Sequence, residues 1–142
     1  MTPDALARAC AEKMQANDKA CEGMGIRLVE VGPGHATMSM RVTEVMSNGH
    51  GMCHGGFIFS LADSTFAYAC NAANQMAVAA QCTISFLRPV RVGNTLVAVA
   101  EFRAEAGRTG IYDVRVSRGD EIVAEFRGHS RMIGQKYFED LP

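Results

Sequence analysis

The segment 48–56 and the apolar stretch that follows it hold the residues best suited to chemistry. The segment reads NGHGMCHGG and contains Asn48 and His54. The apolar stretch, 57–80, contains a single acidic residue, Asp63. Burying an ionised carboxylate without a partner is costly, so such a group is paired, protonated or retained for function. Asp63 is therefore a candidate catalytic group; the alternative is that it reaches solvent or caps a neighbouring loop.

Two consecutive glycines, Gly55 and Gly56, stand where a helix is expected to begin. A helix N-terminus presents free backbone N–H groups and the positive end of the helix dipole, which suits a developing oxyanion. Glycine also lets a substrate approach the backbone closely. A plain turn of small residues is the alternative, but a buried acid farther along the same helix favours a site that polarises a carbonyl group.

The spacing of Gly55 and Asp63 limits how they could act together. They are eight residues apart, which is roughly 12 Å along a helix and too far for both to touch one carbonyl group. Two antiparallel helices meeting at a two-fold axis would bring each Asp63 towards the partner's Gly55, with two sites per dimer. If the site is catalytic, the sequence predicts that two copies of the chain share it.

Three possible metal donors, His50, Cys53 and His54, lie within five residues. A structural zinc site needs a fourth ligand, and the distant His35 and His129 have no ligand-like neighbour. No metal or other cofactor is therefore expected. A nucleophilic Cys53 beside a histidine is a second alternative, although cysteine is often just a small buried hydrophobe. His54 is expected to orient the loop or polarise a carbonyl group.

The hydrophobic patterns predict an α+β fold in one domain, residues 1–142. A helix is expected over 3–20 and a second over 55–72, and the latter is apolar in nearly every direction, which is typical of a buried helix. Short turns require successive later strands to pair antiparallel. We expect a central helix against an antiparallel sheet of about five to six strands. The expected strands are 26–31, 36–42, 77–87, 94–106, 109–118 and 121–133.

Composition excludes several classes of protein. The net charge of -1 disfavours a nucleic-acid partner. The stretch 57–80 is interrupted by polar residues, so no membrane span is expected. The N-terminal residues mix charges and lack an apolar signal core, and the five cysteines form no CxxC pair. These features predict a cytoplasmic protein with reduced thiols.

Arginines are scattered over the C-terminal half of the chain. The guanidinium group matches phosphate geometry, so a subset could bind the phosphates of a nucleotide-like ligand. Arg88 and Arg108, at the ends of expected strands, are the candidates.

The stretch NGHGMCHGGFIFSLADSTFAYACN (48–71) resembles the hotdog-fold thioesterases, and among them the PaaI subfamily of phenylacetate degradation. The resemblance continues through CTISFLRPV (82–90), GRTGIYDVRV (107–116) and AEFRGHSRMIG (124–134). It implies a long helix wrapped by an antiparallel sheet. It also implies self-association into homodimers and homotetramers, and hydrolysis of phenylacetyl-CoA and ring-hydroxylated phenylacetyl-CoA thioesters without a cofactor.

The resemblance also implies roles for individual residues. Asp63 matches the family's catalytic acid, as nucleophile or general base, and the Gly55 N–H matches the group that polarises the thioester carbonyl. Asn48 matches the polar residue near the attacking water, and His54 matches the loop histidine that supports the carbonyl site. Some family members add a Ser or Thr from the following strand; here Thr83 and Gln81 are the candidates for that substrate contact.

Two other functions stay open at this point. A hotdog hydratase or dehydratase would use a similar scaffold on an acyl-CoA or carrier-bound double bond, without releasing thiol. A non-catalytic acyl-CoA binding module would bind tightly without turnover. The presence of Asn48, Gly55 and Asp63 together argues against the binding module, because a binder has no evident need for the acid.

Overall fold

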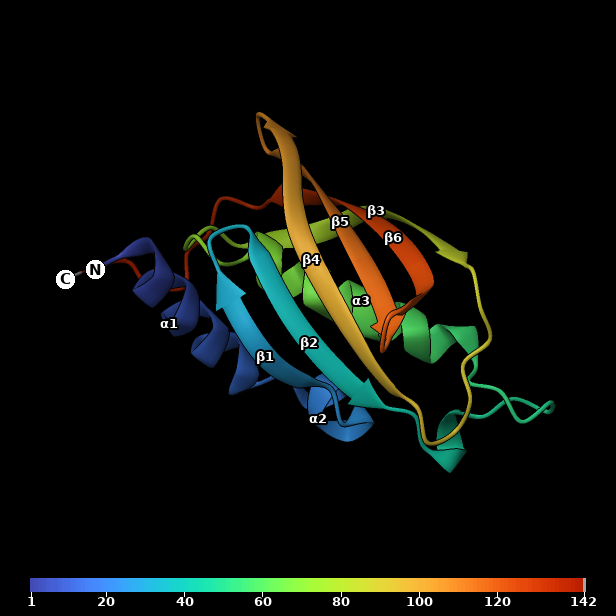
Figure 1. The fold of residues 1–142 in the computed structure, drawn as a ribbon. Helices are drawn as coiled ribbons and strands as arrows, with labels where there is room; N and C mark the ends of the chain where they lie inside the picture. The colour runs from blue at the N-terminus through green and yellow to red at the C-terminus, as the bar shows by residue number, and fades with distance from the viewer. Residues whose placement is uncertain (142) are drawn as a thin grey trace.

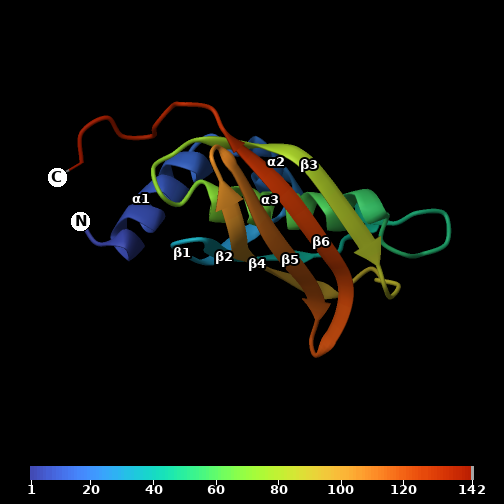
Figure 2. The same ribbon diagram turned by 90° about the horizontal axis from the view of Figure 1, so that it is seen from above.

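The apolar stretch after the two glycines forms the central helix, α3 (Gly55–Cys70). The computed structural model describes residues 1–141. Most side chains of α3 are buried or half-buried, as expected for a helix that is apolar around most of its circumference. A single curved sheet wraps around α3, with its concave face towards the helix (Figures 1 and 2).

The sheet has six strands in the order β1-β2-β4-β5-β6-β3, and all neighbours pair antiparallel. This arrangement confirms the predicted α+β fold. The last three strands follow one another through tight turns. Strand β3 precedes them in the chain but lies at the far edge of the sheet, beside β6. The strands are β1 (Arg27–Gly32), β2 (His35–Arg41), β3 (Ala77–Phe86), β4 (Thr95–Ala106), β5 (Thr109–Arg118) and β6 (Glu121–Met132).

The predicted helix over 3–20 is wrong in one respect, because the chain forms two helices there. These are α1 (Pro3–Gln15) and α2 (Lys19–Met24). Asp18 caps the start of α2, and its other carboxylate oxygen accepts a hydrogen bond of 3.0 Å from the Tyr68 hydroxyl of α3. A cap and a tertiary contact therefore break a segment whose residues favour one continuous helix.

Alternation along the strands separates an inner face from an outer face. The inner side chains of the middle strands are fully buried and form the core over α3; they include Met38, Met40, Leu96, Ala98, Val114 and Val116. On β6, Gly128 lies directly over α3: a β-carbon there would stand 2.8 Å from the Phe66 ring. Glycine at this position lets α3 pack closely against the sheet.

A loop joins β2 to α3 through the short helix η1 (Glu44–Met46) and the segment 47–54. The segment is held by backbone hydrogen bonds from Cys53 N–H to Val90 O and from His54 N–H to Met46 O, both 2.7 Å. No helix in the described part of the chain is long and apolar enough to span a membrane.

Candidate functional site

A pocket of about 440 Å³ lies between the segment 47–54, the start of α3 and the connection that follows β3. Three of the predicted site residues line it: Asn48, Gly55 and Arg88. Most of the remaining wall is apolar, from residues such as Ile58, Phe86, Leu87 and Val90. The tertiary structure therefore places polar groups from separate segments around one largely apolar space, which is the usual form of a small-molecule site.

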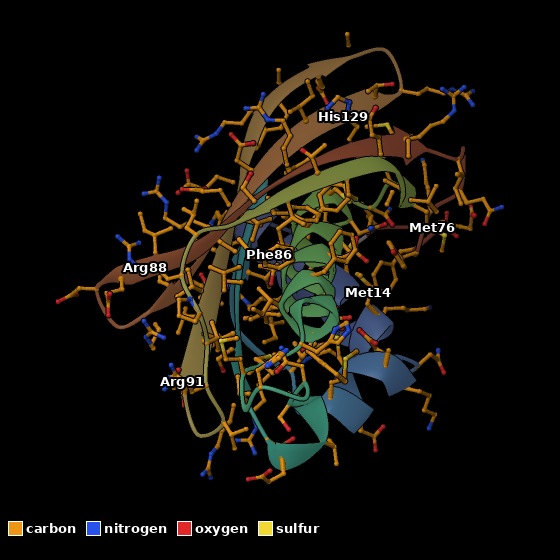
Figure 3. All side chains as sticks on the ribbon, turned by 90° about the vertical axis from the view of Figure 1, so that its right-hand side faces the viewer. Met14, Met76, Phe86, Arg88, Arg91 and His129 are labelled. Carbon is orange, nitrogen blue, oxygen red and sulfur yellow. The ribbon has the colours of Figure 1, made fainter. Side chains whose placement is uncertain are left out.

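Gly55 is the first residue of α3, and its N–H group is free to meet a ligand. Among residues 1–141, no hydrogen-bond acceptor is found for it. A β-carbon on residue 55 would stand 3.1 Å from Cζ of Phe86. Phe86 lies beside the end of α3 that faces the viewer in Figure 3. Glycine at position 55 thus allows both the close approach of Phe86 and access to the helix N-terminus.

His54 caps α3. Its Nδ1 accepts a hydrogen bond of 2.9 Å from the Gly56 N–H, and its ring meets Phe57 edge-on with centroids 6.4 Å apart. The side chain is exposed and does not line the pocket. In the structure His54 orients the loop and the helix start, while its support of a carbonyl group stays a prediction.

Asn48 uses its side-chain oxygen within the loop. Oδ1 accepts hydrogen bonds from the N–H groups of His50, at 2.8 Å, and Met52, at 3.3 Å. The side-chain NH₂ group is therefore what Asn48 can offer to a ligand or a water in the pocket.

The two alternatives based on Cys53 find no support. Cys53 is buried, and burial raises the pKa of its thiol, so it lacks the thiolate character of a nucleophilic cysteine. His50 is exposed on the loop. Within residues 1–141, no group of three or more His, Cys, Asp or Glu side chains is arranged to hold a metal ion.

Asp63 lies farther along α3, outside the pocket that Gly55 lines. It is half-buried, and burial raises the pKa of its carboxyl group. A hydrogen bond from Cys82, with Sγ 3.9 Å from Oδ1, acts in the opposite direction and lowers that pKa. Among the described residues, no Lys, Arg or His forms an ion pair with Asp63. Asp63 is thus a carboxyl group in a largely uncharged setting.

Within one chain, Gln81 and Thr83 do not face Asp63, and their expected contact with substrate stays a prediction. Both side chains are exposed, and the side chain between them, Cys82, turns inward opposite Gly128 and reaches Asp63. Successive side chains of a strand point to opposite faces, so Gln81 and Thr83 lie on the outer face, away from α3. In the second half of β3, half-buried Cys82 and Ile84 alternate with exposed neighbours, and this alternation identifies Cys82 as a residue of the inner face.

Arg88 and Arg108 lie at opposite ends of β5. Arg88, labelled in Figure 3, lines the pocket and is held at the start of β6, where its guanidinium donates to Ile122 O and lies 3.6 Å from Glu121. Arg108 belongs to the β4–β5 turn at the other end of that strand. One chain therefore does not form a phosphate clamp from both arginines; Arg88 alone borders the site.

The chain is similar to known proteins in both sequence and fold. The family model of the thioesterase superfamily matches residues 50–125. The acyl-coenzyme A thioesterase PaaI of Escherichia coli is 47% identical over 125 residues, which cover 87% of this chain and 89% of that protein. The solved structure of the E. coli PaaI protein from the phenylacetic acid degradation operon has a TM-score of 0.93 and 43% identity, covering 95% of this chain and 99% of that one.

A protein of Streptococcus mutans, solved with bound acetyl-CoA, shares the fold with a TM-score of 0.74. It is 25% identical, and the match covers 78% of this chain and 90% of that one. Fold, family model and sequence identity agree with one another. The chain belongs to the thioesterase superfamily, as a hotdog-fold thioester hydrolase similar to PaaI.

Proposed function

We propose that this protein hydrolyses acyl-CoA thioesters to free acid and CoA, with phenylacetyl-CoA and ring-hydroxylated phenylacetyl-CoA as its substrates in phenylacetate catabolism. The observation that carries the proposal is the free Gly55 N–H at the start of α3, in an apolar pocket bordered by Asn48 and Arg88. The similarity to E. coli PaaI, and the acetyl-CoA bound by the S. mutans protein, support the substrate class.

In this proposal the thioester carbonyl accepts a hydrogen bond from the Gly55 N–H. The positive end of the α3 dipole stabilises the oxyanion that develops as the carbonyl is attacked. The apolar wall at Ile58 and Phe86 accommodates the acyl group, and Arg88 stands at the rim, where it can meet a phosphate of CoA. The Asn48 NH₂ group holds a water near the carbonyl.

Asp63 reaches the thioester only from a second copy of the chain. A homodimer in which two α3 helices run antiparallel about a two-fold axis would bring Asp63 of the partner subunit to the Gly55 pocket. Two dimers then assemble into the proposed tetramer. We also propose that residues 1–142 form one thioesterase domain. The cytoplasmic location of the protein stays a prediction.

A difference between the two edges of the sheet supports a dimer that pairs along β3. The β1 edge carries charged Arg27 and Glu30, has a bulge, and lies beside α1. The β3 edge, AVAAQCTISF, contains no charged residue and exposes about half of Val78 and Phe86, at 50% and 52%. An uncharged edge strand with unpaired backbone groups invites pairing with another strand. A second copy pairing along β3 would cover it.

Two chemical routes fit the groups at this site. Asp63 either attacks the carbonyl carbon to form a mixed anhydride, which water then hydrolyses, or it removes a proton from the water held near Asn48. In both routes the C–S bond breaks and CoA leaves as its thiolate. Burial makes the Asp63 carboxylate more basic than an exposed one, which favours either role.

The decisive measurement is thiol release from phenylacetyl-CoA, compared with acetyl-CoA and a long-chain acyl-CoA. Asp63→Asn is the control, and we expect it to lose most turnover while keeping ligand binding and self-association. Enzyme-only blanks are needed because any accessible thiol among the five free cysteines can react with a thiol reporter; Cys70 and Cys82 are only partly buried.

Each outcome has a distinct meaning. Asp63-dependent release that favours the aryl substrate supports the whole proposal. Release that favours another acyl group retains the thioesterase and rejects the phenylacetate assignment. Turnover in Asp63→Asn equal to that of the wild type rejects the role of Asp63. No release from any ester would favour the hydratase or the binding module.

A further inference from the structure

We infer that Cys82 is a positioning residue for Asp63: its thiol donates a hydrogen bond that holds the carboxylate on the β3 side of α3. The inference rests on the catalytic role proposed for Asp63, and it assigns a function to a strand residue outside the Gly55 pocket. Cys82 acts through Asp63 and touches no reacting atom.

The packing of α3 against the sheet places the two side chains together. Cys82 pairs with Gly128 across the β3–β6 ladder, and the Phe66 ring packs so closely on Gly128 that a β-carbon there would stand 2.8 Å from it. Asp63 precedes Phe66 by one helical turn and faces the inner side of β3, where its Oδ1 lies 3.9 Å from Sγ of Cys82. The distance is long for oxygen donors but within the range of a sulfur donor.

Cys82 is the single hydrogen-bond donor to the Asp63 carboxylate within residues 1–141. Burial, and next the negative charge of Asp63, raise the pKa of the Cys82 thiol, so it stays in the S–H form that can donate. A carboxylate with one fixed donor has a preferred orientation, whereas a carboxylate with none rotates freely about its last torsion angle.

The other titratable groups near Asp63 are thiols that stay neutral at physiological pH. Cys21 of α2 has its pKa raised by burial to about 11, and Cys70 of α3 to about 12. Among the described residues of one chain, Asp63 is therefore the group at this place that titrates in the acidic range. A shift of the pH profile between variants at position 82 then reports on the hydrogen bond from Cys82.

The test compares Cys82→Ala and Cys82→Ser with the wild type. The bond favours the ionised carboxylate, so removing it in Cys82→Ala raises the pKa of Asp63, and the acid limb of kcat/KM moves to higher pH. We expect a shift of about half a pH unit, and about threefold lower activity on that limb, for a weak bond to an ionised group. Cys82→Ser keeps a donor and should restore the acid limb to the wild-type position or below.

Ser85→Ala is the matched control, because Ser85 lies on the same strand but is exposed on its outer face. It should leave the profile unchanged. A Cys82→Ala variant whose kcat/KM falls equally at all pH values, with the acid limb at the wild-type position, would show that Cys82 only fills space. That result would overturn the inference.

A carbon-13 NMR titration of the Asp63 carboxyl group provides a second test that needs no turnover. Its pKa should rise in Cys82→Ala and not in Cys82→Ser; equal values in all three proteins reject the inference. This separates two failures. Full activity in Asp63→Asn would reject the proposed function, whereas an inactive Asp63→Asn with an unchanged Asp63 titration in Cys82→Ala rejects only the role of Cys82.

Discussion

The ring of Phe86, at the end of β3, packs on Gly55, at the start of α3, so closely that a β-carbon on residue 55 would stand 3.1 Å from Cζ of the ring. This contact joins the edge strand to the helix terminus that offers its free N–H to the pocket. The position of the proposed oxyanion donor therefore depends on the absence of a side chain at residue 55.

Gly55→Ala should lower the rate of thioester hydrolysis strongly and the melting temperature only slightly. The added methyl group must displace the Phe86 ring and crowd the space beside the N–H, and small displacements of an oxyanion donor cost about tenfold or more in rate. Steady-state thioester hydrolysis and a thermal melt measure the two effects. Gly23→Ala is the control: it is also a helical glycine, and a β-carbon there meets nothing within 4 Å. An active Gly55→Ala enzyme would mean that the carbonyl binds elsewhere.

Replacing Asp63 should stabilise the protein while it removes activity. Burial raises the carboxyl pKa in the folded chain. An acid with a raised pKa contributes stability below its unfolded pKa, and that contribution is lost as pH rises through the folded pKa. At pH 7 the ionised Asp63 carboxylate therefore destabilises the folded protein, and Asp63→Asn should melt a few degrees higher than the wild type. Melts at pH 7 and near pH 4 check this, since the difference should shrink at the lower pH.

Asp113, on the outer face of β5, should show the opposite pH dependence. Hydrogen bonds from Arg127 and Arg103 lower its pKa to about 2. The resulting stabilisation is present above the unfolded pKa of an aspartate and is lost as pH falls towards 2. Asp113→Asn should lower Tm at pH 7 by a few degrees and leave activity intact. The difference in Tm between Asp113→Asn and the wild type should disappear as the pH falls towards 2. A difference that stays constant with pH would contradict the lowered pKa of Asp113.

Gly128→Ala should weaken the fold at the contact between β6 and α3. The new methyl group would stand 2.8 Å from the buried Phe66 ring, which has little room to move in the core. Overpacking of this kind costs about 1–3 kcal/mol in the free energy of unfolding. Denaturant unfolding measures it, again with Gly23→Ala as reference. Equal stability of the two variants would show that α3 can shift away from the sheet.

Much of the architecture was predictable because its signals are local. Alternating apolar residues in 94–106 and 109–118, and short turns between strands, indicate an antiparallel sheet without knowledge of the partner strands. The unbroken helix over 3–20 was not correct, because Asp18 caps a second helix there and also accepts a hydrogen bond from Tyr68, which lies fifty residues away.

The sequence by itself determined the α+β class, the central helix, the glycines at its start and the carboxylate farther along it, because hydrophobic periodicity and residue type act over short distances. The tertiary structure alone decided which groups meet. It brought Arg88 to the Gly55 pocket and left Arg108 at the other end of β5. It also turned Cys82, not Gln81 or Thr83, towards Asp63. The physical reason is that register across a sheet, and the face a strand presents to a helix, are set by packing between segments distant in the chain.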